Sequence, residues 1–299
     1  MYLKMMTYPF IETYCSKMPI RESYSCRLAE LRHALDRAEY VVIGAGAGLS
    51  AATGLEYSGR RFTNHFGDFI RRYGFTDLYT SSFYPFKTEE ERWAYWARHI
   101  RQNRYDEAGT ELYQMLLRVV ERKEWFVITT NVDGQFEKAG FDRKRIFAVQ
   151  GDYAYLQCAE ACHDKLYYNE ALVHEMTPNT ENCRIPASLV PHCPVCGGLM
   201  EVNLRKDDHF VQDAHWYESQ ERYQTFMQKA CRRNALFLEL GVGYNTPAII
   251  RFPFERMASQ ADNITLVRIN RDYAEKQAPV RSFIPFREDI NKIITDILK

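Results

Sequence analysis

Four short apolar runs along the chain have the composition of buried strands. They cover residues 40–43, 125–130, 235–240 and 263–270. Runs of this length, rich in β-branched and aromatic residues and without polar alternation, are typical of parallel strands covered on both faces. Longer segments with apolar residues at helical spacing lie between them. This alternation predicts a doubly wound α/β fold around a parallel sheet.

The helical segments are expected to cover this sheet. Residues 27–38 carry apolar side chains at positions 28, 31, 34, 35 and 38, and Ser25 is the expected N-cap. In residues 89–100, Trp93, Trp96 and Ile100 share one face, which favours a core position over a stacking platform for bases. Residues 1–24 show no clear period and are expected to form a surface arm. Further helices are expected at residues 107–121, from residue 224 onward, and at 284–298.

The first predicted strand runs into a glycine-rich turn, Gly46-Ala47-Gly48-Leu-Ser50, which is followed by Gly54. Glycine has no Cβ and tolerates positive φ, so phosphate oxygens can approach backbone N–H groups there. We therefore expect a nucleotide pyrophosphate at this turn; close packing is the structural alternative. A Rossmann dehydrogenase fits poorly, because glycines soon interrupt the following helix and no strand ends in an acidic residue at the required distance.

Polar side chains follow the second predicted strand, in Thr129-Thr-Asn131-Val-Asp133-Gly134. The carboxyl ends of parallel strands form the edge at which open α/β sheets bind ligands. Asn131 can donate to and accept from a carboxamide, and Asp133 can accept from a carboxamide nitrogen or a ribose hydroxyl. An Asx turn that caps the next helix is the structural alternative.

Composition narrows the class of protein. Lys plus Arg equals Asp plus Glu at 39 each among 299 residues, so no net field favours nucleic acid or an anionic membrane. No apolar stretch reaches membrane-spanning length, and the N-terminus has no signal-peptide pattern. Eight cysteines in a chain this long do not make a disulfide framework, so we expect a cytoplasmic protein with a metal site.

Two cysteine pairs predict a structural zinc site. Cys158 and Cys162 form a C-x3-C pair, and Cys193 and Cys196 lie in a C-P-V-C-G-G sequence typical of a zinc knuckle. Four thiolates complete a tetrahedron and leave no open position for catalysis. Substitute ligands in the same region are Cys183, His163 and His192, and metal-free thiols are the remaining alternative.

Together these motifs resemble the sirtuin family. Sirtuins carry G-A-G-I-S-x-x-x-G-I, then T-Q-N-I-D-G followed by A-G, then paired cysteines, a G-T-S strand end and a late asparagine. The corresponding segments here are residues 46–54, 129–134, 139–140, 158–196, 239–243 and 269–270. The resemblance covers residues 40–299 and implies a Rossmann-like domain that binds NAD, with a smaller domain of zinc ribbon and helical insertion. The implied bounds are 1–60 with 105–155 and 235–299 for the NAD-binding domain, 61–104 for a helical insertion and cofactor lid, and 156–234 for the zinc-ribbon domain.

The resemblance also implies residue roles. Asn131 and Asp133 would hold the nicotinamide end of NAD and Gln150 the adjoining ribose, and these three are the expected catalytic residues. Asn270 is expected at the adenosine ribose, with a turn before Arg271 as the alternative. The other expected cofactor-binding residues are Gly46, Ala47, Gly48, Ser50, Gly54, Gly241, Gly243 and Arg271.

Three departures from the family pattern point to a different reaction. Val149-Gln150-Gly151 stands where sirtuins have a catalytic H-G, and an amide cannot act as the base that deacylation needs near neutral pH. Glu56-Tyr-Ser-Gly59 replaces P-D-F-R, and the F-G-E that helps to clamp an acetyl-lysine peptide is absent from residues 200–208. This combination resembles the bacterial macrodomain-linked, or class M, sirtuins.

That closer resemblance implies an NAD-dependent protein ADP-ribosyltransferase. It further implies a lipoylated carrier protein, like the glycine-cleavage H protein, as the acceptor, and a macrodomain ADP-ribosyl hydrolase that reverses the mark. An NAD-dependent lysine deacylase is the alternative enzyme. A module that senses NAD or ADP-ribose is the alternative without catalysis.

Overall fold

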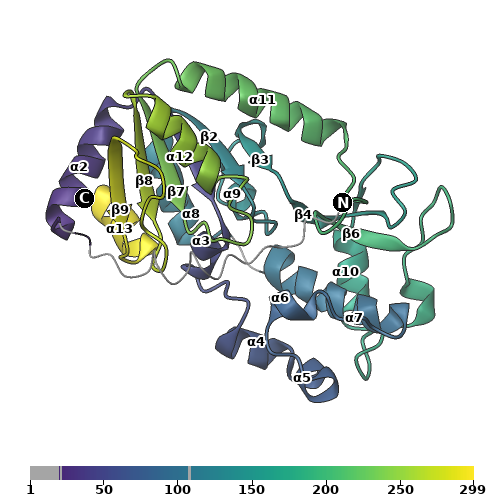
Figure 1. The fold of residues 1–299 in the computed structure, drawn as a ribbon. Helices are drawn as coiled ribbons and strands as arrows, with labels where there is room; N and C mark the ends of the chain where they lie inside the picture. The colour runs from purple at the N-terminus through teal and green to yellow at the C-terminus, as the bar shows by residue number, and fades with distance from the viewer. Residues whose placement is uncertain (1–19, 21, 107–108) are drawn as a thin grey trace.

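A parallel sheet of six strands forms the centre of the larger part of the molecule (Figure 1). The computed structural model describes residues 20, 22–106 and 109–299, so most of the arm expected at residues 1–24 lies outside the described residues. The strand order is β3-β2-β1-β7-β8-β9, with every neighbouring pair parallel. The strands are β1 (Tyr40–Ala45), β2 (Glu124–Thr129), β3 (Ile146–Ala148), β7 (Ala235–Leu240), β8 (Ile264–Ile269) and β9 (Ser282–Phe286). The chain reverses its direction of growth between β1 and β7, which is the switch point of a doubly wound sheet.

Helices cover both faces of this sheet. On one face lie α2 (Tyr24–Arg37), α3 (Ala47–Ala51), α8 (Glu111–Val120), α9 (Gln135–Lys138) and α13 (Ile290–Ile297), which share an apolar core with Val41 and Ile43. On the other lie α11 (Ala214–Ala230) and α12 (Arg251–Gln260), which pack with Val42 and Phe237. Successive strand residues therefore point into opposite cores, as the continuous apolar runs predict. The predicted α/β fold class is confirmed.

Several predicted element bounds are wrong in detail. Ser23, not Ser25, caps α2, since its Oγ accepts a hydrogen bond from the Cys26 amide. The helix expected from residue 224 begins at Ala214, because Asp213 accepts from the Trp216 amide and caps it there. Residues 284–286 belong to β9 and not to the last helix. In each case a capping group or a sheet neighbour fixed a boundary that apolar spacing left open.

A smaller three-stranded sheet and a group of helices form a second layered unit. Its strands are β4 (Gly151–Cys158), β5 (Tyr167–Tyr168) and β6 (Met200–Leu204), in the order β5-β4-β6. Its helices are α4 (Gly59–His65), α5 (Gly67–Tyr73), α6 (Leu78–Ser81), α7 (Glu89–Ile100), the π-helix η1 (Arg101–Tyr105) and α10 (Glu170–Met176). Trp93, Trp96 and Ile100 are buried in its core, as expected from the face they share.

The helical insertion and the small sheet share this one core. Phe66 and Phe69 from the insertion are buried in the same cluster as Leu156 and Val202 of β4 and β6. Helix α11, in contrast, packs against β1, β2 and β3 of the large sheet, although its residues fall within the expected zinc-ribbon segment. The remaining short helices are η2 (Arg143–Arg145) and η3 (Ala187–Leu189). The domain bounds given above stay a prediction.

Candidate nucleotide site and metal centre

The glycine turn after β1 packs directly on the end of β7. The Gly48 amide donates to the Gly241 carbonyl at 3.0 Å. A Cβ on Gly46 would lie 2.8 Å from the Gly241 oxygen, and one on Gly48 would lie 2.7 Å from the Gly241 Cα. Gly241 has φ +60°, and its own Cβ would come within 2.4 Å of the Gly48 carbonyl carbon. The packing alternative therefore accounts for these three glycines, since any side chain would separate the two turns.

Other small residues at this edge face open space. Among the residues that the structure describes, no heavy atom lies within 4 Å of a Cβ built on Gly243 or on Gly54, and Gly54 has φ +87°. Ala47, at the tip of the turn, is exposed. These positions leave the backbone accessible, which is what close approach of a phosphate or sugar requires.

A buried polar cluster joins the glycine turn to the end of β2. Asp133 accepts from the Ser50 hydroxyl at 2.5 Å and from the Gln135 amide at 3.1 Å. The Ser50 and Tyr113 hydroxyls are 2.8 Å apart. Burial raises the pKa of Asp133, although the Ser50 and Gln135 hydrogen bonds oppose that effect. Tyr113 was not expected in this cluster, because a tyrosine on the buried face of α8 has the pattern of an ordinary core residue.

Asn131 has its amide orientation fixed by this cluster. Its Nδ2 donates to the Gly46 carbonyl at 3.1 Å and also contacts the Ser50 and Tyr113 hydroxyls at 3.1 and 3.3 Å. A carbonyl oxygen can only accept, so the nitrogen must face Gly46. Within the described part of the chain, Oδ1 then makes no hydrogen bond and remains an acceptor for a ligand.

Gln150 lies in the connection between β3 and β4, next to the same loop. The Val149 amide donates to the Thr129 carbonyl at 3.1 Å, which places this connection beside the end of β2. The Gln150 backbone carbonyl accepts from the Arg205 amide at 3.0 Å, and its side chain is half-buried. Gly151 has φ +94°, and a Cβ there would lie 2.0 Å from the Asn203 carbonyl oxygen. A glycine at this position is therefore a backbone requirement of the turn that presents Gln150.

The Asn270 side chain is engaged in the loop that follows β8. Its Nδ2 donates to the Val242 carbonyl at 2.8 Å, and its Oδ1 accepts from the Asp272 and Tyr273 amides at 3.1 and 3.0 Å. This is the Asx turn given above as the alternative to a ribose contact. The Arg271 side chain, 88% exposed, extends into solvent from the same loop.

A second buried polar chain connects the helical insertion to β4. The Tyr95 hydroxyl donates to the Leu78 carbonyl at 3.0 Å, so it accepts from His99 Nδ1, also at 3.0 Å. His99 Nε2 must then accept from the Tyr153 hydroxyl at 2.9 Å. The Tyr153 oxygen in turn accepts from the Tyr57 hydroxyl at 3.0 Å. This assignment holds for a neutral ring, and His99 is neutral near pH 7 because burial lowers its pKa to about 3.

The four paired cysteines converge on one point. The Sγ atoms of Cys158, Cys162, Cys193 and Cys196 all lie within 4.8 Å of one another, and two of the pairs are 3.6 and 3.7 Å apart. Four sulfurs at about 2.3 Å from a tetrahedral zinc ion are about 3.8 Å apart, so this spacing fits zinc. The Gly198 amide points to Cys196 Sγ at 3.4 Å, as in a zinc knuckle. The predicted structural zinc centre is supported.

The alternative ligands lie outside that tetrahedron. His163 places Nδ1 3.1 Å from Cys162 Sγ and Nε2 2.9 Å from the Tyr167 hydroxyl, which makes it a neighbour of the sulfurs and not a fifth ligand. His192 Nδ1 lies 3.3 Å from the Gly197 carbonyl oxygen. Cys183 is buried apart from this group.

The fold and these features together define a class of protein. A parallel sheet of this strand order, with a glycine turn at the switch point and polar side chains on the next strand end, is that of an α/β nucleotide-binding protein. The sequence model described as the Sir2 family matches residues 46–206, more than half of the chain. The chain therefore belongs to the Sir2 family, and the resemblance inferred from its motifs is confirmed. It is an enzyme of that family, with NAD as substrate and a structural zinc site.

Two relatives are similar over most of this chain. One, from Staphylococcus aureus strain Mu50, is named a protein ADP-ribosyltransferase and is 37% identical over 271 residues, which cover 90% of this chain and 86% of the relative. The other, from Fusarium oxysporum f. sp. cubense, is named a probable bifunctional ADP-ribose hydrolase/ADP-ribosyltransferase. It is 32% identical over 262 residues, which cover 84% of this chain and 43% of the relative.

Solved Sir2 structures share the fold. One, of Sir2Tm bound to a propionylated peptide, has a TM-score of 0.54 at 15% identity and covers 91% of this chain and 97% of that one. Another, of Sir2 with a p53 peptide and NAD+, has a TM-score of 0.53 at 16% identity with the same coverage. At this identity the likeness shows the fold. In the described residues, no helix has the length and apolar character needed to cross a membrane.

Proposed function

We propose that this protein is an NAD-dependent protein ADP-ribosyltransferase, a pentosyltransferase that moves ADP-ribose from NAD to a protein acceptor and releases nicotinamide. The observation that carries the proposal is Gln150, an amide without a titratable proton, at the β3–β4 connection that lies beside the carboxyl end of β2. A sirtuin deacylase needs a base at that position. The names of the Staphylococcus aureus and Fusarium oxysporum relatives support the same activity.

The residues around the turn can serve the nicotinamide end of the substrate. The free Oδ1 of Asn131 suits the N–H2 of a carboxamide, and Asp133, held by Ser50, places a carboxylate behind it. In the reaction the bond between nicotinamide and ribose C1′ breaks, and the bonding pair leaves with neutral nicotinamide. A nucleophile of the acceptor forms the new bond to C1′ and gives up its proton to solvent. Positioning and electrostatics are enough for this step, and no ribose hydroxyl has to be deprotonated.

His99 does not replace the missing imidazole. Both of its ring nitrogens are occupied by tyrosine hydroxyls, and the side chain is 1% exposed. A base must reach the proton that it removes. A deacylase that uses water or another group as the base is therefore the weaker candidate.

For the acceptor we propose a lipoylated carrier protein like the glycine-cleavage H protein, as the class M resemblance implies. We also propose that a macrodomain ADP-ribosyl hydrolase removes the mark. The Fusarium oxysporum relative supports the second point, because its name joins a hydrolase and a transferase in one longer chain. A cytoplasmic location is part of the same proposal.

One experiment separates these activities. NAD labelled in its adenylate half is incubated with the protein, an acetylated peptide and carrier protein with and without lipoylation. Label fixed to the lipoylated carrier alone supports the transferase with the proposed acceptor. Deacetylated peptide with free label supports the deacylase, and bound NAD without any product supports a sensing module. Gln150→His is the matched variant: an imidazole there is expected to raise deacetylation, whereas Gln150→Ala is expected to lower transfer.

A further inference from the structure

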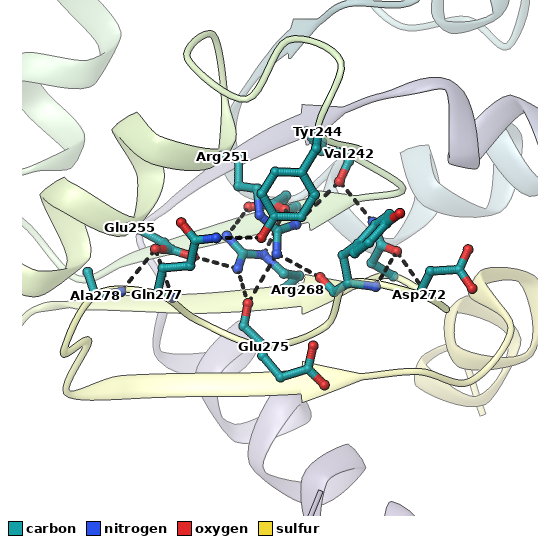
Figure 2. Close-up of polar contacts among 12 residues, drawn as sticks. Val242, Tyr244, Arg251, Glu255, Arg268, Asp272, Glu275, Gln277 and Ala278 are labelled. Carbon is teal, nitrogen blue, oxygen red and sulfur yellow. Dashed lines mark hydrogen bonds and ion pairs between the residues drawn. The ribbon is translucent and has the colours of Figure 1, made fainter. Parts of the chain in front are cut away.

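A cluster of buried charges lies beneath the loops that follow β7 and β8 (Figure 2). Arg268 donates from Nε and Nη2 to the Glu239 carboxylate at 2.7 and 2.8 Å, and from Nη1 to Glu255 at 2.6 Å. Arg251 donates to Glu239 at 3.3 Å. The side chains of both arginines and of Glu239 are fully buried, and that of Glu255 is 4% exposed. Two cations and two anions balance in charge.

Stability alone does not account for this cluster. Removing paired charges from water is costly, and well-packed apolar residues are often as stable or more so. In the described part of the chain, Arg251 also leaves its buried Nε without a hydrogen-bond partner, which adds to the cost. The rest of the core on this face of the sheet is largely apolar. The cluster therefore indicates a role that apolar side chains could not fill, which is hydrogen bonding to the backbone of the neighbouring loops.

Its charges hold the backbone of the loop between β8 and β9. Arg251 Nη2 donates to the Tyr273 and Glu275 carbonyls at 2.8 and 3.1 Å, and Arg268 Nη1 donates to the Glu275 carbonyl at 2.5 Å. The Glu255 carboxylate accepts from the Gln277 and Ala278 amides at 3.1 and 3.2 Å. Residues 271–278 form no helix or strand, so these hydrogen bonds satisfy backbone groups that a helix or sheet would otherwise pair.

The same cluster fixes the loop that follows β7. Arg251 Nη1 lies 3.4 Å from the Val242 carbonyl, and the Arg251 guanidinium carbon lies 4.5 Å from the centre of the Tyr244 ring. The Tyr244 hydroxyl accepts from Gln277 Nε2 at 2.8 Å, which joins the two loops directly. Figure 2 shows Tyr244 over Arg251, with Gln277 and Glu255 beside them. The two loops are thus held as one unit against the glycine turn.

We propose that Arg251 and Glu255 are positioning residues that hold residues 241–250 and 271–278 in place as a preformed seat for the adenosine half of NAD. The exposed Gly243 lies on the loop after β7, which borders the switch point of the sheet, and the exposed Arg271 lies on the loop after the next strand, β8. When a loop is already ordered before binding, no binding free energy is lost to the conformational entropy of ordering it. The proposal rests on NAD as the substrate of the proposed transferase, and it is independent of the acceptor.

Glu255→Gln in the full-length chain tests it. The glutamine amide has one oxygen, which can accept, and one N–H2 group, which cannot. Its N–H2 group would therefore face a donor, either on Arg268 or on the Gln277 and Ala278 amides, and one set of hydrogen bonds would be lost. The dissociation constant of ADP-ribose, measured by calorimetry, and the KM for NAD are both expected to rise about tenfold, with kcat within about twofold of wild type. Asp262→Asn is the matched control, because its ion pair with Arg281 is exposed and lies at the other end of β8. It is expected to change neither quantity.

The outcomes separate this inference from the proposed function. The positioning role is overturned if the folded Glu255→Gln protein binds ADP-ribose with wild-type affinity. It is also overturned if kcat falls as strongly as KM rises. If Glu255→Gln does not fold, Tyr244→Phe decides, since it removes the hydroxyl that accepts from Gln277 and keeps the ring against the Arg251 guanidinium. That variant is expected to weaken ADP-ribose binding about threefold, and unchanged binding overturns the inference. A wild-type protein that binds ADP-ribose but modifies no acceptor refutes the transferase and leaves this inference standing.

Discussion

Acidification is expected to destabilise the protein through one buried side chain, His99. Its neutral ring accepts a hydrogen bond from the Tyr153 hydroxyl and donates one to the Tyr95 hydroxyl, and 1% of the residue is exposed. In acid the ring can take up one further proton. Burial, and to a smaller extent the charge of Arg61, lower its pKa from 6.5 to about 3. The unfolded chain therefore binds this proton far more readily than the folded chain. The contribution to stability is complete above pH 6.5 and is lost as the pH falls from 6.5 towards 3.

The size of the effect follows from that shift in pKa. Between the two pKa values, each pH unit lowers the free energy of unfolding by about 1.4 kcal/mol per proton bound. At about pH 5 the loss from His99 alone is about 2 kcal/mol, a large part of the roughly 5–15 kcal/mol that stabilises a typical domain. Protonation would also break the chain of hydrogen bonds, because Nε2 would become a second donor facing Tyr153.

Urea unfolding at about pH 7.5 and about pH 5 measures this loss, with tryptophan fluorescence as the signal. Trp96 is a suitable reporter, since its ring lies 5.0 Å from that of His99. His99→Gln is the matched variant, because it keeps an acceptor and a donor but cannot titrate. Carboxylates, other histidines and the zinc thiolates titrate in both proteins and cancel in the difference. If the variant loses as much stability on acidification as the wild type, the reasoning is wrong.

Three further predictions concern the two sites. Asn131→Ala should reduce transfer to the carrier by about 100-fold or more, and a wild-type rate in the labelling assay would refute its role. Zinc chelation, or Cys193→Ala, should lower the melting temperature by more than about 5 °C, with about one zinc per chain measured before chelation. Gly241→Ala should destabilise the fold by about 3 kcal/mol in urea, because φ is +60° and its Cβ would meet Gly48. Gly243→Ala, in open space, should change stability by less than about 0.5 kcal/mol; if both glycine variants behave alike, the packing argument fails.

The sequence was most informative where one local feature decides the structure. The central strands β1, β2, β7 and β8 are mainly apolar, so their burial on both faces could be predicted, although the buried charges Glu239 in β7 and Arg268 in β8 could not. The edge strands were missed. β3 has three residues, and β9 contains Pro285, which removes a donor and is tolerated because the strand is at the edge. Both need a neighbouring strand to be recognisable.

The site shows the same division. Closely spaced cysteine pairs predict a metal-ligand set from the sequence alone, and the four sulfurs do converge on one point. Whether a polar residue in a turn faces a ligand or its own backbone depends on contacts between segments far apart in sequence. Asn131 leaves its Oδ1 without a partner among the described residues, whereas Asn270 uses both ends of its amide within the loops. The roles of Tyr113 and His99 could not be predicted either, because each is a single polar side chain on an otherwise apolar helix face.

Three buried polar clusters lie on segments that border the carboxyl edge of the large sheet. One joins Ser50 and Tyr113 to the loop after β2. The His99 chain reaches that loop as well, since the Tyr153 amide donates to the Val132 carbonyl at 3.0 Å. The third, around Arg268, holds the loops after β7 and β8. Buried polar groups specify one geometry at a cost in stability, whereas apolar packing tolerates several. Their concentration at this edge therefore argues that the enzyme needs a fixed loop geometry where open α/β sheets bind their ligands.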